Sequence, residues 1–116
     1  MTKNELRIVI GNKIRNERIS RNMSIIELAD LMEQTPGFVG LIERGQRGAT
    51  AHNLLKLSHI FDLPVDAFYS NKHTETYDVA ESLRKKVVAY ISDFSEKELQ
   101  SILLVFKGFR QLKDDD

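Results

Sequence analysis

Three histidines, His52, His59 and His73, are the side chains of this sequence best suited to bind a metal or to move a proton. His52 and His59 are seven residues apart, which places them on one face of a helix. No carboxylate or third ligand accompanies them at a recognised spacing, so we interpret them as surface residues and expect no metal. The chain has no cysteine, which excludes disulfides and thiolate ligands.

Glycine and serine, the other residues that could support catalysis, do not form a known motif. Gly37, Gly40, Gly45 and Gly48 have the spacing of turns and helix ends, unlike that of a dinucleotide-binding loop. No serine lies in a nucleophile motif. We therefore expect a protein that is not an enzyme and has no cofactor.

The charge of the chain is balanced, with 17 basic and 17 acidic side chains and a formal net charge of zero. Any affinity for a polyanion must therefore come from the local placement of charge. Arg84, Lys85 and Lys86 form a basic run that we interpret as a solvated helix face, with a patch that contacts a polyanion such as DNA as the alternative. Without a signal peptide or an apolar stretch of membrane-spanning length, we expect a cytoplasmic protein that does not contact a membrane.

Apolar spacing predicts an all-α fold with five helices in residues 1–69. Leu6, Ile10 and Ile14 recur at helical spacing and mark a first helix over about residues 3–20. Thr50 caps a fourth helix, and Pro64 opens a short fifth. Apolar residues make up 41% of the chain, enough to build a packed core around these helices.

The second and third helices have strong start and stop signals. Ser24 and Glu27 form a capping box that opens a helix ending near Met32. Thr35-Pro36 opens a short helix that ends near Arg44, with Gly45 as its stop. Two short helices joined by a tight turn form a helix-turn-helix, whose second helix must protrude far enough to enter a major groove.

The remainder of the chain is predicted to comprise a polar linker at 70–76, a helical hairpin at 77–113 and a frayed acidic tail at 114–116. The first helix of the hairpin carries one apolar stripe, at Val79, Leu83, Val87 and Ile91. The second carries another, at Leu99, Ile102, Leu103, Phe106 and Phe109. Part of this second stripe is expected to pack on the preceding helix. For the rest, we favour a homodimer interface over packing back onto residues 1–69.

Residues 10–69 resemble the Cro/C1-type helix-turn-helix, the xenobiotic-response-element-like family. The resemblance covers about half of the chain and implies a five-helix lambda-repressor-like DNA-binding domain. The two-part layout resembles the Sin-type repressors of spore-forming bacteria. The matching residues are Ile10, Gly11, Ile14, Arg15, Arg18, Ser24, Leu28, Ala29, Thr35, Val39, Ile42, Glu43, Arg44, Gly45, Leu54, Leu57 and Val65.

This resemblance implies a role for individual residues. Arg18 is expected to form a structural pair with Glu43 that positions the third helix, which would read double-stranded DNA. The amides of Ser24 and Ile25 are expected to form an anion site for the DNA backbone. The expected DNA contacts are Ser24, Thr35, Pro36, Gly37, Phe38, Gly40, Leu41, Arg44, Gln46 and Arg47. Of these, Arg44, Gln46 and Arg47 would contact phosphates.

Both the motif turn and the reading face depart from the family pattern. The turn has Glu33 and Gln34, where family members usually have glycine and then an apolar residue. At the reading positions the side chains are Pro36, Gly37, Gly40 and Leu41, none of which can hydrogen bond to base edges.

Two hypotheses therefore stand. In the first, the protein is a homodimeric, sequence-specific regulator, a repressor on a two-fold symmetric operator. The glycines would let its backbone approach DNA closely, and shape would supply specificity. In the second, the protein is a diverged helix-turn-helix that binds a related regulator through its C-terminal helices and antagonises it. We favour the first because Thr35, Arg44 and Arg47 remain available for DNA contacts.

Overall fold

The computed structural model describes residues 1–70 and 78–114, and all regular elements in these ranges are helical. The expected all-α class is therefore confirmed. The predicted linker at 70–76 falls, after Ser70, outside the described residues, as do 115–116 of the predicted tail. The elements are α1 (Lys3–Ser20), α2 (Ile25–Met32), α3 (Pro36–Glu43), α4 (Ala51–Phe61), the 3-10 helix η1 (Val65–Tyr69), α5 (Val79–Tyr90) and α6 (Glu96–Asp114).

Hydroxyl side chains begin the first four helices. Each accepts a hydrogen bond from the backbone amide three residues further on, which satisfies one of the donors that a helix start leaves free. These caps are Thr2, Ser24, Thr35 and Thr50. The fifth helix expected after Pro64 is present as a single 3-10 segment. The local cap signals in the sequence thus fix where the helices of the first domain start.

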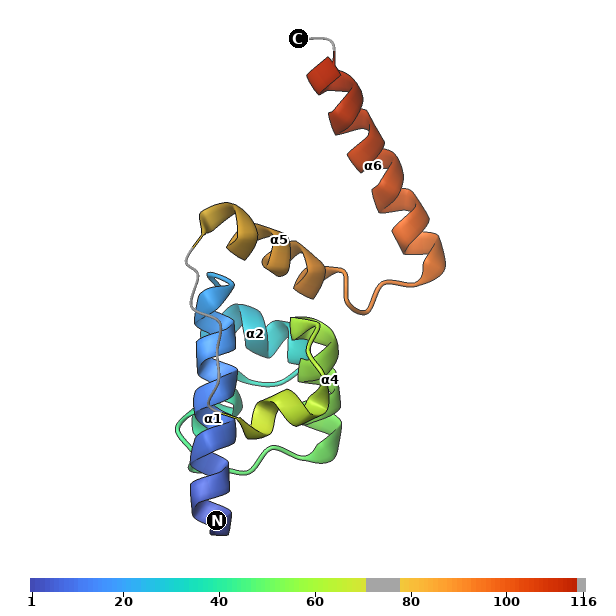
Figure 1. The fold of residues 1–116 in the computed structure, drawn as a ribbon. Helices are drawn as coiled ribbons and strands as arrows, with labels where there is room; N and C mark the ends of the chain where they lie inside the picture. The colour runs from blue at the N-terminus through green and yellow to red at the C-terminus, as the bar shows by residue number, and fades with distance from the viewer. Residues whose placement is uncertain (71–77, 115–116) are drawn as a thin grey trace.

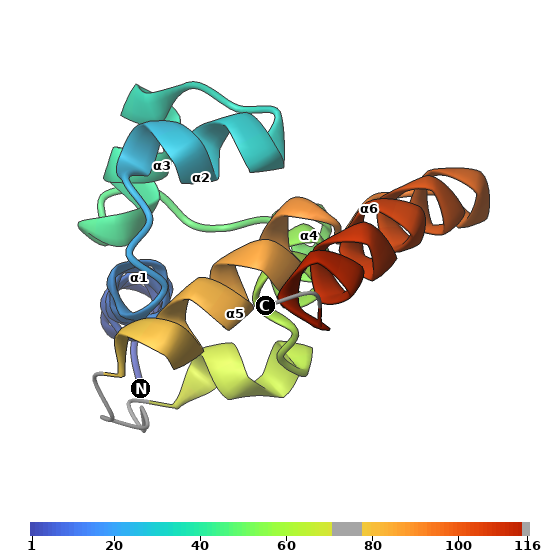
Figure 2. The same ribbon diagram turned by 90° about the horizontal axis from the view of Figure 1, so that it is seen from above.

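The core of the first domain lies between α1, α2, α3, α4 and η1. Helix α1 contacts both α3 and η1, and α2 contacts α3 and α4, so these four α-helices and η1 surround one apolar centre. Figure 2 shows α2 and α3 together on one side of α1. The buried apolar side chains are Ile10, Ile14, Met23, Leu28, Ala29, Met32, Val39, Ile42, Leu54, Leu57, Ile60, Phe61, Phe68 and Ala89.

Helix α5 packs on the first domain, which differs from the expected separate hairpin at 77–113. It contacts α4, and its Ser82 hydroxyl donates to the Ser20 carbonyl at 2.7 Å. The small residues Ser82 and Ala89 are buried, whereas Leu83 and Val87 of the predicted stripe are exposed. Small side chains permit the close approach, so the face of α5 that carries Ser82 and Ala89 docks on the domain, and Leu83 and Val87 stay exposed.

Helix α6 extends away from the remaining helices, and α5 does not pack along its length (Figure 1). The molecule measures 58 × 30 × 23 Å as a result. No described side chain of α6 is buried, and its apolar residues include Leu103 at 50% exposure and Phe109 at 67%. Of this stripe, Ile102 and Phe106 line a groove together with side chains of α5.

Candidate nucleic-acid interface

The start of α2 is one part of the interface that the sequence predicts. Ser24 accepts from the Glu27 amide at 3.0 Å, and the Ser24 amide donates to Glu27 Oε1 at 3.1 Å. The capping box is therefore present. It also means that the Ser24 amide, which we expected to be free for a phosphate, is already occupied by Glu27. Ser24 itself is exposed at this helix end.

The turn between α2 and α3 has its sharp bend at Glu33. This residue ends α2 in the left-handed conformation, with φ 59° and ψ 42°. A residue with a Cβ atom pays an energetic cost there, which explains why glycine is the usual choice at such helix ends. Thr35 then accepts from the Phe38 amide at 3.2 Å, and Pro36 takes the first position of α3.

A bidentate ion pair joins the end of α1 to the end of α3. Arg18 Nε donates to Glu43 Oε2 at 2.8 Å, and Nη2 donates to Oε1 at 3.0 Å. The third nitrogen, Nη1, donates to the Met23 carbonyl at 2.9 Å. The side chains are 12% and 3% exposed, so the pair is shielded from water. The expected pair is present, and its fork geometry fixes α3 relative to α1 and to the turn before α2.

Two glycines allow α1 to lie directly against α3. A Cβ atom on Gly11 would overlap the backbone carbonyl oxygens of Ile42 and Glu43. Gly45, just after α3, has φ +73°, and a Cβ atom there would lie 2.8 Å from an Ile8 side-chain carbon. Gly11 and Gly45 are therefore required for the close packing of α1 against α3, which the sequence resemblance alone did not reveal.

The exposed side of α3 carries most of the predicted reading residues. Thr35, Pro36 and Gly37 are exposed, and Leu41 is half-buried. A Cβ atom on Gly37 would meet nothing within 4 Å, so this turn of α3 is open to a neighbouring molecule. Gly40 differs from expectation, because it is buried and Arg44 Nη1 would lie 2.9 Å from its Cβ position. Close approach at Gly40 requires Arg44 to move.

The cations at the end of α3 are held in place by neighbouring side chains. Arg44 Nε donates to Gln46 Oε1 at 3.1 Å. The Arg47 guanidinium lies 4.8 Å from the Phe38 ring centroid, within the range of a cation–π contact. All three polar residues are exposed. These contacts limit the motion of two flexible arginines on the same edge of the motif, which favours phosphate binding there.

Helix α5 supplies residues to this region that the sequence did not indicate. Lys86 Nζ lies 2.9 Å from Glu27 Oε2, and it also donates to the Asn22 carbonyl at 3.0 Å. The Tyr90 hydroxyl donates to the same Glu27 oxygen at 2.8 Å. Hydrogen bonds from Lys86, Tyr90 and the Ser24 amide lower the pKa of Glu27 to about 2. The interpretation of the basic run as simply solvated is thus wrong for Lys86.

The comparisons with known proteins fall on this same region. A family model described as helix-turn-helix matches residues 14–68, which extend from the middle of α1 to η1. The segment is a Cro/C1-type helix-turn-helix domain. No curated protein matches the chain in sequence. The matched segment contains the Arg18–Glu43 pair, both motif helices and the αL turn at Glu33.

The family assignment gives the chain its general function. Helix-turn-helix domains of this type bind DNA in transcriptional regulators, and such regulators are normally not enzymes. In the parts of the chain that the structure describes, no group of three or more potential metal ligands occurs. None of the described helices is long and apolar enough to cross a membrane.

Proposed function

We propose that this protein is a homodimeric, sequence-specific repressor that binds a two-fold symmetric operator. The observation that carries the proposal is that one chain combines two features. Helix α3 is held rigidly and its surface at Gly37 is free of neighbouring atoms, and the long helix α6 has an exposed apolar face. The first feature supplies a surface for one half-site. The second supplies a means to join two such surfaces, which binding to a symmetric operator requires.

Base reading in this proposal relies on backbone approach and shape. Pro36 and Gly37 present little more than backbone, so α3 can lie deep in a major groove. Specificity then comes from the ease with which DNA adopts the required groove width, together with contact of Phe38 or Leu41 with thymine methyl groups. Arg44 and Arg47, at the end of α3 and just past it, hold phosphates of the DNA backbone.

The dimer interface in this proposal is formed by α6 and the groove beside it. The groove has a volume of about 410 Å³ and is lined by apolar side chains of both α5 and α6, such as Val87 and Phe106. A helix that buries none of its apolar residues against the described parts of its own chain is expected to bury them in an association. An equivalent α6 from a second copy has the complementary apolar face.

Binding to operator DNA is the direct test of the function. The full chain is mixed with the DNA upstream of its own coding sequence, and complexes are resolved by gel shift at low salt, where phosphate contacts are strongest. We expect one complex that persists against excess unrelated DNA. Absence of any complex at low salt would contradict the proposal.

Phe106→Asp tests the proposed interface. A charge on the apolar face of α6 should separate the dimers, halve the sedimentation mass and weaken operator binding by about tenfold or more, because the linked second half-site is lost. Ser101→Asp adds the same charge on the opposite face of α6 and is the matched control. An unchanged mass for Phe106→Asp would remove this interface from the proposal.

Arg44→Ala tests the proposed phosphate contact. Operator and unrelated DNA should both bind more weakly, and the slope of log affinity against log salt should fall by about one. Arg110→Ala, on the exposed surface of α6, controls for the loss of one positive charge. A defect confined to one base position would instead assign Arg44 to base reading.

The second candidate function is antagonism of a related regulator by heterodimer formation through α6. The absence of side-chain donors at Pro36 and Gly37 favours it, as does the zero formal net charge of the chain. It predicts that the chain binds DNA weakly and that its α6 pairs with the corresponding helix of the related regulator. Co-purification that yields homodimers with tight DNA binding would dispose of it.

A further inference from the structure

Three polar side chains on one face of α5 contact the chain from the end of α1 to the first turn of α2. They recur every four residues, so they lie above one another on the helix. Their acceptors follow the chain in the same order. Ser82 donates to the Ser20 carbonyl at 2.7 Å, Lys86 to the Asn22 carbonyl at 3.0 Å and Tyr90 to Glu27 Oε2 at 2.8 Å. Helix α5 is therefore bound before, within and after the α1–α2 junction, residues 21–24.

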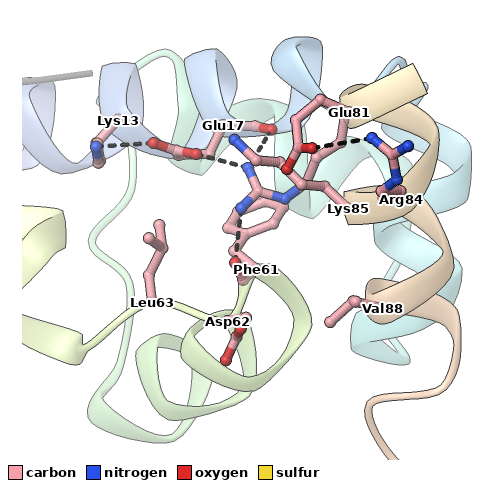
Figure 3. A pocket seen from close by; sticks show the side chains of 10 residues that line it. Lys13, Glu17, Phe61, Asp62, Leu63, Glu81, Arg84, Lys85 and Val88 are labelled. Carbon is pink, nitrogen blue, oxygen red and sulfur yellow. Dashed lines mark hydrogen bonds and ion pairs between the residues drawn. The ribbon is translucent and has the colours of Figure 1, made fainter. Parts of the chain in front are cut away.

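The rest of α5 is packed loosely against the domain. A cavity of about 640 Å³ lies between α5, α1 and the end of α4, with Lys85 and Val88 of α5 in its wall (Figure 3). A groove of about 410 Å³ lies between α5 and α6. The residues of α5 that are buried are Ser82 and Ala89. The position of α5 on the domain thus depends strongly on its polar contacts at the junction.

The α1–α2 junction sets where α2 starts relative to α3. Asn22 has φ 54°, a left-handed conformation that is uncommon outside glycine and needs support from its surroundings. From α1, Arg18 Nη1 donates to the Met23 carbonyl at 2.9 Å, while its other two nitrogens bind Glu43 of α3. From α5, Lys86 holds the carbonyl of Asn22. Two cations thus fix successive carbonyls just before the cap of α2.

Lys86 also neutralises a carboxylate at the predicted contact with the DNA backbone. Glu27 lies in the first turn of α2, the helix end that we expect to meet phosphates. Without a partner, its negative charge would repel them. Lys86 Nζ lies 2.9 Å from Glu27 Oε2, and the two side chains are only 23% and 32% exposed, which limits the screening of the pair by solvent. With Lys86 in place, the pair adds no net charge to this part of the interface.

We propose that Lys86 and Tyr90 are positioning residues for DNA binding. In this role they hold the α1–α2 junction and neutralise Glu27, so that the start of α2 can meet the DNA backbone while α3 enters the major groove. Lys86 Nζ already binds two groups of its own chain, so its effect reaches DNA through α2. The proposal rests on the proposed DNA-binding function and extends the DNA-binding unit from the matched residues 14–68 to α5.

The test compares the affinity of full-length variants for the upstream DNA described above, over a range of salt concentrations. Lys86→Gln should bind about tenfold more weakly, because Glu27 is then unpaired beside the phosphates. The slope of its log affinity against log salt should stay as in the wild type, because no phosphate contact is lost. Tyr90→Phe, which removes one hydrogen bond to Glu27, should bind about threefold more weakly.

Rescue variants separate positioning from a general loss of structure. Lys86→Arg keeps the charge and has donors for both acceptors, so it should bind DNA as the wild type does. The double variant Lys86→Gln/Glu27→Gln leaves no charge unpaired and should recover most of the affinity that Lys86→Gln loses. Arg84→Gln removes an exposed cation of the same helix, one that pairs with Glu81, and should leave the affinity unchanged.

Amide hydrogen exchange of the free protein reports on the same contacts without DNA. The Met23 amide donates to the Arg18 carbonyl at 3.2 Å, and the Ser24 amide donates to Glu27 Oε1 at 3.1 Å. Both amides should exchange about tenfold faster in Lys86→Gln than in the wild type, because the junction opens more often. In Lys86→Arg they should exchange at the wild-type rate.

Three results would overturn the proposal while the wild type binds DNA. The first is equal affinity of Lys86→Gln and the wild type. The second is a salt slope lowered by about one in Lys86→Gln, which would make Lys86 a direct phosphate contact. The third is an equal loss of affinity in Arg84→Gln, which would indicate a general basic patch on α5. A wild type that binds no DNA would instead contradict the proposed function itself, and the exchange rates would still show whether α5 holds the junction.

Discussion

Helices α3 and α6 form for opposite reasons. Helix α3 has eight residues, of which Val39, Gly40, Ile42 and Glu43 are buried. Helix α6 has nineteen residues, and no described side chain among them is buried. An eight-residue helix is too short to be stable alone in water, so α3 depends on the domain that surrounds it.

Helix α6 depends instead on local interactions. Ser95 Oγ accepts from the Glu98 amide at 3.2 Å, and Glu98 Oε1 accepts from the Ser95 amide at 3.1 Å, which makes a second capping box. Its length permits many intrahelical hydrogen bonds. The comparison teaches that the orientation of α3 is fixed within one chain, whereas the apolar face of α6 is left for association.

Gly11→Ala should produce the largest loss of stability, because it disrupts the contact between α1 and α3 that holds α3 in place. The new Cβ would overlap two backbone carbonyl oxygens at the end of α3, which cannot move away as a side chain could. We expect a loss of about 3 kcal/mol in the free energy of unfolding, measured by urea denaturation with circular dichroism.

Gly37→Ala is the matched control for that change. It lies on the open side of α3, where a Cβ meets nothing within 4 Å. Its effect should be neutral or a gain of up to about 1 kcal/mol, from the better helix propensity of alanine. Equal stabilities for the two variants would mean that α1 and α3 do not touch as described.

Arg18→Met should have the next largest effect. It leaves the Glu43 carboxylate, 3% exposed, without its bidentate partner. Stranding a shielded charge should cost about 2 kcal/mol of unfolding free energy and loosen α3 enough to weaken DNA binding. The double variant Arg18→Met/Glu43→Leu should recover much of the stability, since no charge is then left unpaired. A double variant less stable than Arg18→Met would contradict this account.

The first domain was largely predictable from sequence because its signals are local. Capping residues such as Ser24 and Thr35, and the apolar spacing of α1, act within one helical turn, and the structure has these helices where they were expected. The Arg18–Glu43 pair was found only through resemblance, because 25 residues separate its partners.

The placement of α5 could not be predicted in the same way. Its apolar stripe suggested a buried face, yet Ser82 and Ala89 make the contact with the domain. Packing here is decided by the fit of small residues and by hydrogen bonds to distant partners, such as Lys86 to Asn22. Hydrophobic periodicity does not encode either of these, so it could not predict the contacts of Lys86 and Tyr90 with Glu27.

The contacts of Lys86 and Tyr90 with Glu27 predict an acid-dependent loss of stability. The pKa of Glu27 is about 2 in the folded protein, against an ordinary value of 4.5. Its stabilisation is therefore complete above pH 4.5 and is lost as the pH falls from 4.5 toward 2. Because the carboxylate is partly exposed and screened, we expect wild type to lose about 1 kcal/mol more than Glu27→Gln over this range.

Lys86→Gln tests whether α5 is responsible for this pH dependence. It removes the largest contribution to the lowered pKa of Glu27, so its loss of unfolding free energy in acid should be smaller than that of wild type. Arg84→Gln removes a cation from the same helix without touching Glu27 and should behave like wild type. A Lys86→Gln profile identical to wild type would show that α5 does not rest on α2.

Gly108→Ala in a Phe106→Asp background should have the smallest effect on the stability of the first domain. It tests directly whether α6 unfolds independently of α3. Gly108 lies within α6, and a Cβ there meets nothing within 4 Å. Alanine should favour the helical state of α6 by up to about 1 kcal/mol and raise the helical content. In a monomer whose α6 is independent, this gain does not reach α3, so the unfolding free energy reported by amide exchange in the core should be unchanged. A gain in core protection equal to that in α6 would show that the two helices unfold together, and that α6 is bound to the domain rather than left for a partner.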